Sequence, residues 1–317
     1  SVCQSVLSSC CLSAALSPTN RISDEFIIMS NEPLISIVIP CFKMGAYIGE
    51  ALESVGKQSY THWEVIAVDD CGPEDGTQAI VESFAASHPD HRVEFTRLEQ
   101  NGGVSVARNA GIKAAKAEVL AFLDPDDIWT QDHLERHMLA RKGKDEPLMV
   151  TASKVGIFQD GNGLQVDMLW GYSAWEQQVF PLSLAMRNAM NPSASLVPKA
   201  LVVSVGGFDE DRALQHTEDW DLWLRLVEAG AEFVFVNEMT GYYRQHAGAG
   251  TANRQVIDER LSAFAEKNIG RILPKLSLAT FRMSNRVEGI EARLDWIQKN
   301  PVMRMLSFFQ RLIGKKQ

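Results

Sequence analysis

Two clusters of carboxylates stand out among the residues that could do chemistry. The first is Asp124-Pro125-Asp126-Asp127, where neighbouring carboxylates repel unless a cation or hydrogen-bond donors compensate. Mg²⁺ and Mn²⁺ prefer carboxylate oxygens, and Mg²⁺ is commonly bound by one or two carboxylates together with substrate phosphates. Such a turn could bind a metal through one carboxylate and a ribose hydroxyl through another. Asp-x-Asp strings also occur as ordinary turn and cap residues, so the position of this turn in the fold has to decide.

The second cluster is Asp69-Asp70, which follows an apolar run. A carboxylate here can accept the N–H of a uracil or guanine base, and we interpret the pair as nucleotide-binding. The alternative is a purely structural turn. For Asp75 and Thr77, just downstream, we prefer that alternative and expect a helix cap.

A glycine-containing segment with one basic residue follows at 101–111, Asn-Gly-Gly-Val-Ser-Val-Ala-Arg-Asn-Ala-Gly. Two glycines before a helix let the backbone approach a ligand, and a helix N-terminus favours anions. The segment lacks the G-x-G-x-x-G spacing, so a dinucleotide site is not indicated. Arg108, near the middle of the predicted helix, is expected either to reach the nucleotide or to pair with Asp70.

Acidic residues also open a predicted helix at 218–228, which begins Glu218-Asp219-Trp220. Carboxylates in a first turn suit the helix dipole, and this alone would explain them. A general base in a cleft would also be a carboxylate, with apolar surroundings raising its pKa. His246 follows a predicted strand and precedes a loop of small residues. It is either structural or a metal or phosphate ligand.

Strand-like and helix-like segments alternate in the first half of the chain. Repeated βα units predict an α/β fold with a Rossmann-like, mostly parallel sheet flanked by helices, and ligands beyond the carboxyl ends of the strands. Two of the four strand ends carry the carboxylate clusters, which favours a functional role for both. The predicted strands are 35–40, 63–69, 92–98 and 118–124, and the predicted helices are 45–57, 75–87 and 104–115.

The second half is less regular. We predict strands at 148–153, after 191–195, at 233–236 and at 241–244. The chain then divides into a nucleotide-binding half (31–135) and an acceptor-binding half (136–252) of one domain. A helical C-terminal region (253–317) follows. Residues 1–30 are predicted to be a disordered extension, because their Ser/Cys-rich composition looks unfolded and Met29 resembles a natural start.

Bulk composition excludes several classes of protein. The chain has 317 residues and a formal net charge of -9, and this acidity argues against a nucleic-acid partner. Five cysteines show no zinc-ligand spacing and suit reduced thiols in a cytoplasmic protein. No apolar run reaches the roughly 18–20 residues that span a bilayer.

Together the motifs resemble family 2 glycosyltransferases with a GT-A fold. The resemblance covers about 33–250, with the motifs in the order of the family. It rests on the strand ending at Pro40-Cys41, Val-Asp-Asp-x-x-x-x-Asp-Gly-Thr at 68–77, Ala-Arg-Asn-Ala-Gly at 107–111, Phe-Leu-Asp-Pro-Asp-Asp at 122–127, Gly-Gly-Phe-Asp-Glu at 206–210, Glu218-Asp219, and Tyr243-Arg244-x-His246.

The resemblance implies a role for each site residue. The nucleotide of a nucleotide-diphosphate sugar, with a UDP-sugar favoured, would lie against Pro40, Cys41, Asp69, Asp70, Arg108 and Asp124, with Asp70 or Asp69 at the base and Asp124 at the ribose. Mg²⁺ or Mn²⁺ would be bound by Asp126, with Asp127 and His246 as further candidates. Asp219 would be the base of one inverting displacement, and Glu218 and Trp220 would lie on the acceptor side.

The resemblance also has departures. The usual Asp-Asp-Gly-Ser is Asp69-Asp70-Cys71-Gly72 here, and the Gln-x-x-Arg-Trp signature of processive members is missing. We therefore expect transfer of one hexosyl residue to a saccharide or lipid-linked acceptor, in surface polysaccharide or glycolipid synthesis. Trp170, Tyr172, Trp175 and Trp220 could stack on sugars or belong to the core.

Two alternative functions and the placement of the C-terminal segment stay open at this level. A sugar nucleotidyltransferase also combines such a sheet with a carboxylate-bound metal, but it usually has a Gly-rich basic loop after the first strand. A catalytically inactive nucleotide-sugar binder would lack the base or the metal turn. The segment 301–317 could form a basic amphipathic helix. Such a helix either packs on its own domain or lies at the inner face of a membrane.

Overall fold

The computed structural model describes residues 32–142, 147–247, 255–272 and 274. The expectations for 1–30 and 301–317 lie outside this part of the chain. The strands are β1 (Ile35–Cys41), β2 (Trp63–Asp69), β3 (Val93–Arg97), β4 (Val119–Phe122), β5 (Ile128–Trp129), β6 (Met149–Gln159), β7 (Met168–Trp170), β8 (Ser195–Pro198) and β9 (Glu232–Gln245).

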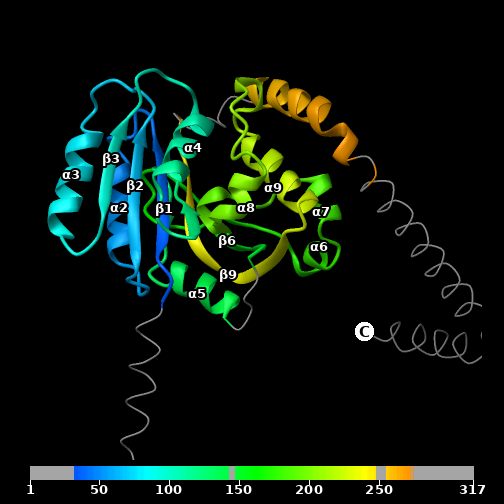
Figure 1. Cartoon of the computed structure of the whole chain (residues 1–317), viewed down its shortest axis with the longest axis horizontal. Coiled ribbons are helices and arrows are strands. Elements are labelled where there is room, and N and C mark those ends of the chain that lie inside the picture. Colours follow the sequence, from blue (N-terminus) through cyan, green and yellow to red (C-terminus); the bar gives the residue numbers. More distant parts are fainter. Residues whose placement is uncertain (1–31, 143–146, 248–254, 273, 275–317) are drawn as a thin grey trace, which may run out of the picture.

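Helices connect and cover these strands. They are α2 (Ile48–Gly56), α3 (Thr77–Ser87), α4 (Val104–Ala114), α5 (His133–Arg141), α6 (Ala174–Gln178), α7 (Leu182–Met186), α8 (Lys199–Ser204) and α9 (Glu218–Glu228), with short 3₁₀ turns η2 (Pro192–Ala194) and η3 (Arg212–Leu214). Residues 255–272 are also helical and run past α9 (orange in Figure 1).

One sheet runs through both halves of the chain, in the order β3-β2-β1-β4-β8-β6-β9-β5, with β7 pairing to β6. The first four strands are parallel, as the βα pattern predicts. β8 is antiparallel to both β4 and β6. The prediction of two short strands at 233–236 and 241–244 is wrong in one respect, because both segments belong to the single strand β9. The pairing of β9 with β6 shifts register near Lys154, and this irregularity allows β9 to continue from the first segment to the second.

Apolar side chains fill both faces of the sheet. In β1, Ile35, Ile37 and Ile39 pack on the side of α2, whereas Val38 packs on the side of α4 and α9. This alternation is the period of two expected of a strand buried on both faces. Gly111 is required in α4, because a Cβ there would lie 2.4 Å from Cγ1 of Val38.

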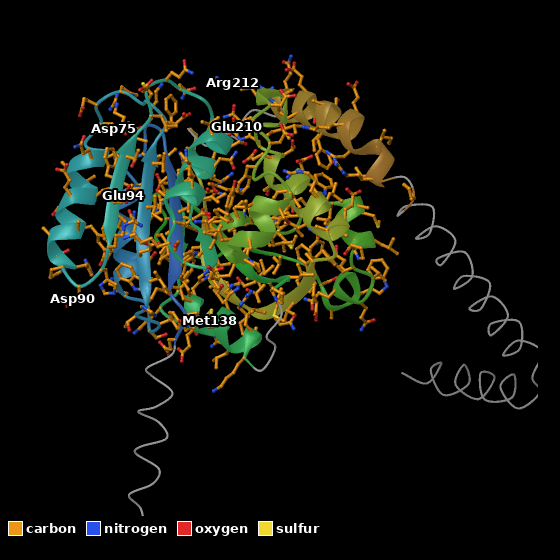
Figure 2. The ribbon with its side chains drawn as sticks, in the orientation of Figure 1. Asp75, Asp90, Glu94, Met138, Glu210 and Arg212 are labelled. Atoms are coloured by element: carbon orange, nitrogen blue, oxygen red, sulfur yellow. The ribbon has the colours of Figure 1, made fainter. Side chains whose placement is uncertain are left out.

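The parallel strands have their carboxyl ends on one side of the molecule and their amino ends on the other. Figure 2 shows Asp75, Glu210 and Arg212 on the upper side, and Asp90 and Met138 on the lower side. The loops after β2 and β4 emerge on the upper side. Arg212 donates to Oδ1 of Asn101 at 2.7 Å, which ties η3 to the loop before α4.

Candidate active site

The two carboxylate clusters follow strands on either side of β1. Cys41 pairs with Asp69 across β1 and β2, and β1 pairs on its other side with β4, which leads into Asp124. The N–H of Asp70 donates to the carbonyl of Cys41 at 2.8 Å. The parallel sheet therefore places both clusters on the same side of the sheet although they are distant in the sequence, as its topology predicts.

Pro40 and Cys41 are both buried within β1. The thiol of Cys41 donates to the carbonyl of Ile39 at 3.5 Å, and burial, with the charge of Asp69, raises its pKa. The thiol is therefore engaged within β1, and contacts of Pro40 and Cys41 with a nucleotide stay predictions. The first exposed residue at this strand end is Phe42.

The carboxylate of Asp70 accepts hydrogen bonds from the loop before α4. One carboxylate oxygen accepts from the N–H of Gly102 at 2.7 Å, and the other accepts from the N–H of Gly103 at 2.7 Å and from Asn101 Nδ2 at 2.8 Å. Gly103 has φ 97° and no side chain to oppose this arrangement. Asp70 thus shapes the loop, and its contact with a base stays a prediction.

Asp69 is also partnered within the protein. It accepts from the N–H of Gly72 at 3.1 Å and pairs with Arg97 at 3.2 Å. Asp75 accepts from the N–H of Thr77, the first residue of α3, at 3.1 Å, but the N-cap residue of α3 is Gly76, so the cap predicted at Asp75 or Thr77 is wrong by position. The loop after β2 is therefore held in shape by its own carboxylates.

Arg108 links the two halves of the site. Its side chain is 3% exposed and forms 2.7 Å ion pairs with Oδ1 of Asp124 and Oε1 of Glu218. Burial alone would lower the pKa of this guanidinium, but the two carboxylates raise it above its usual range. The expected pairing with Asp70 is wrong, because α4 directs Arg108 toward β4 and α9.

The turn after β4 divides its three carboxylates between different tasks. Oδ2 of Asp126 lies 3.1 Å from Nε2 of His246, at the end of β9. Asp127 is 2% exposed and accepts from the N–H of Arg244 at 3.2 Å. Burial raises the pKa of Asp126, and the charge of Asp124 adds to the effect.

Asp127 does not suit the metal role suggested for it. Its carboxylate is turned into the protein, where burial and then the charge of Asp126 raise its pKa well above the usual range. The described residues contain no group of three or more His, Cys, Asp or Glu side chains arranged to hold a metal. A metal would therefore use Asp126 and His246, with phosphate oxygens of a substrate completing its coordination.

Asp126 and His246 fit such a cation chemically. Asp124 is neutralised by Arg108, whereas the carboxylate of Asp126 has only the imidazole beside it. A divalent cation would remove the repulsion that raises the pKa of Asp126. The pair of ligands is held firmly, because the ring of Tyr47 lies 4.6 Å from that of His246.

Arg244 is a site residue that the sequence did not single out for a role. It donates from Nε to the carbonyl of Asp126 at 2.9 Å and forms ion pairs with Asp160 at 2.7 Å and Glu50 at 2.8 Å. Its guanidinium also lies over the ring of Phe158. The only sequence signal was its place in the motif Tyr243-Arg244-x-His246, which does not reveal these partners.

Asp219 has the surroundings of a general base. Oδ1 accepts from the N–H of Trp220 at 2.8 Å, and Oδ2 accepts from Nδ2 of Asn188 at 2.7 Å. Burial raises the pKa of Asp219 to about 7, with a further contribution from the charge of Glu218. A carboxylate that titrates near neutral pH is suited to accept and release a proton.

The tryptophans on this side divide into packed and exposed residues. Trp220 stacks on Phe264 at 4.4 Å and donates from Nε1 to the carbonyl of Leu184 at 2.7 Å. The ring of Trp220 thus packs against the helix 255–272, and its role on the acceptor side stays a prediction. Tyr172 is buried, whereas Trp170 and Trp175 are 37% and 41% exposed.

Comparison with known proteins agrees with this geometry. A profile of the family described as Glycosyl transferase family 2 matches residues 36–200, more than half of the chain. The chain belongs to glycosyl transferase family 2. Membership of this family favours glycosyl transfer over the nucleotidyltransferase alternative.

Two relatives of this family 2 enzyme come from Bacillus subtilis. A putative teichuronic acid biosynthesis glycosyltransferase, TuaG, is 40% identical over 107 residues, which are 34% of this chain and 41% of that protein. An uncharacterized glycosyltransferase, YwdF, is 29% identical over 273 residues, which are 83% of this chain and 94% of that protein. Across the first three curated relatives, including two from Rickettsia, the alignments span 41% to 66% of the relative's length.

Solved structures share the GT-A fold. Residues 1–349 of Staphylococcus aureus TarS in complex with UDP-GlcNAc superpose with a TM-score of 0.56 and 22% identity, over 70% of this chain and 61% of that one. GalNAc-T7 with UDP, GalNAc and Mn²⁺ gives 0.53 and 15%, over 68% of this chain and 44% of that one. At these identities the likeness establishes the fold, as predicted.

Proposed function

We propose that this glycosyltransferase moves one sugar from a UDP-sugar to a hydroxyl group of a saccharide or lipid-linked acceptor, with inversion and with a divalent cation. The observation that carries the proposal is the bridge formed by Arg108. Its guanidinium pairs with Asp124, two residues before Asp126, and with Glu218, the residue before Asp219. One buried side chain thereby fixes the donor turn relative to the base.

Each carboxylate then has a distinct task. Asp124, still 23% exposed at its side chain, is free on one face to bind the ribose. Asp126 and His246 would hold Mg²⁺ or Mn²⁺, which neutralises negative charge developing on the leaving diphosphate. Asp219 accepts the proton of the acceptor hydroxyl as its oxygen attacks the anomeric carbon from the face opposite the diphosphate.

The substrate class has partial support from relatives. TarS structures contain UDP and UDP-GlcNAc, and the TuaG relative carries a role in teichuronic acid biosynthesis in its name. We therefore place the enzyme in the synthesis of a surface polysaccharide or glycolipid. No described helix is both long and apolar enough to cross a membrane.

A donor screen tests the proposed function directly. UDP-, GDP- and dTDP-sugars are incubated with the protein and Mn²⁺, and nucleotide release and the melting temperature are measured for each. A UDP-sugar is expected to be hydrolysed slowly without acceptor and to raise the melting temperature. If no nucleotide sugar is turned over and none shifts the melting temperature, the proposed function is wrong.

The Asp126→Ala variant tests the metal site. It is expected to lose the dependence of UDP binding on Mn²⁺, because the carboxylate of the turn that faces His246 is removed. Calorimetric titration with UDP, with and without Mn²⁺, measures this. The Asp127→Asn variant is the matched control and should keep the metal dependence, since the side chain of Asp127 is bound to the backbone of Arg244. Metal-dependent binding by Asp126→Ala would remove the assignment.

A further inference from the structure

One loop contacts both the backbone of the turn at Asp124 and the carboxylate of Asp219. It runs from the end of α7 through η2 to β8. Asn188, at its start, donates to Oδ2 of Asp219 at 2.7 Å. Ser193, five residues later, accepts from the N–H of Asp124 at 2.9 Å, and its carbonyl accepts from Nε1 of Trp129 at 2.5 Å. The loop thus joins the proposed base to the donor turn from the side opposite Arg108.

The orientation of the Asn188 amide is determined by its other partner. Oδ1 of Asn188 accepts from the N–H of Met190 at 3.1 Å. A backbone N–H can only donate, so the amide oxygen must face Met190 and the NH₂ group must face Asp219. The amide therefore presents a donor, and never an acceptor, to the carboxylate.

Asp219 has few other partners that favour its charged form. Its own helix supplies the N–H of Trp220 and the like charge of Glu218, and α4 supplies the more distant charge of Arg108. Tyr172, before α6, lies close enough to Asp219 that the negative charge of Asp219 contributes to raising the pKa of the Tyr172 hydroxyl. Asn188 is thus the side-chain donor that bonds directly to the proposed base.

We propose that Asn188 is the positioning residue of the base: its NH₂ group holds Oδ2 of Asp219 and leaves the remaining lone pairs for the acceptor hydroxyl. This inference rests on the proposed role of Asp219. A hydrogen bond to the ionised form of a carboxylate favours that form. Asn188 thereby keeps a buried carboxylate able to work as a base near neutral pH and also fixes which oxygen faces the acceptor.

The Asn188→Ala variant provides the test, with the pH dependence of kcat as the readout. Removing the donor is expected to raise the apparent pKa of kcat by about one pH unit. The loss of kcat should therefore be about tenfold below that pKa and largely recovered at alkaline pH. KM for the donor and the melting temperature with UDP should change little, because Asn188 does not contact the donor turn.

Two further variants make the result decisive. Asn188→Asp keeps the shape of the side chain but replaces the donor by a like charge, so the apparent pKa should rise further than in Asn188→Ala. Asn237→Ala is the matched control, since Asn237 also makes one 2.8 Å side-chain hydrogen bond, with Gln177, but is an exposed residue of β9. It should retain the wild-type profile.

The possible outcomes separate this inference from the proposed function. If Asp219→Asn lacks turnover and both Asn188 variants have the wild-type pH profile, only the positioning role is wrong. A loss of kcat that is equal at all pH values would mean a purely structural loop and would also overturn it. If Asp219→Asn keeps normal turnover, the base assignment and the positioning role fail together.

Discussion

The Asp219→Asn variant should lose about a hundred- to ten-thousand-fold in kcat, the range expected when a general base is removed. An amide has the same shape as the carboxylate but cannot take the proton of the acceptor hydroxyl. Donor binding should remain, because Asp219 lies in α9 and the proposed metal ligands lie after β4 and β9. Turnover with acceptor and calorimetric binding of UDP with Mn²⁺ measure the two quantities separately.

The pH dependence of kcat should differ between the wild-type enzyme and the Asp219→Asn variant. With a pKa of about 7, Asp219 in the wild-type enzyme is mostly protonated and inactive as a base below neutral pH. The kcat should therefore rise with pH through about 7 and level off above it. The variant should lack this rise. A variant with near-normal kcat, or with the same pH profile as the wild type, would remove the assignment.

Replacing Arg108 by Met should lower the free energy of unfolding more than any other substitution proposed for this protein. Met keeps much of the apolar volume but leaves Asp124 and Glu218 without their shared cation in a buried site. Breaking a buried ion pair from one side typically costs about 3–5 kcal/mol. For a protein of this size the melting temperature should fall by roughly 10 °C. Thermal unfolding followed by circular dichroism measures this.

Arg136 provides a matched control for Arg108. It also pairs with two carboxylates, those of Asp132 and Glu238, but its side chain is 40% exposed. Exposed ion pairs contribute about 0–1 kcal/mol, so Arg136→Met should lower the melting temperature by only a few degrees at most. Equal melting temperatures for the two variants would show that the Arg108 bridge does not stabilise the site.

Individual elements of both halves could be predicted where their signals are local. The β-branched run that forms β1 and the apolar periodicity of α9 both lie within about a dozen consecutive residues. The same is true of the motifs, since Asp124–Asp127 and Glu218-Asp219 are contiguous in the chain. The placement of Asp124–Asp127 at a strand end followed from the rules of parallel βα units.

The partners of individual side chains could not be predicted in this way. Arg108 could equally have faced Asp70 or the nucleotide, and only the packing of α4 against β1 and α9 directs it to Asp124 and Glu218. The two predicted strands near 233–244 are one strand because β6 supplies a continuous, bulged partner. The partners of Trp220 could not be predicted for a similar reason, since Leu184 and Phe264 lie far from it in the sequence.

The sequence by itself therefore determined the family, the donor-half elements and the identity of the acidic residues. Only the tertiary structure decided which carboxylates are free to act. Both oxygens of Asp70 accept from backbone N–H groups and Asp127 accepts from one, whereas Asp126 faces a histidine and Asp219 accepts from one backbone N–H and one amide. The physical reason is that hydrogen-bond satisfaction and burial depend on groups as far apart as residues 108 and 218, whose proximity no local pattern of residues encodes.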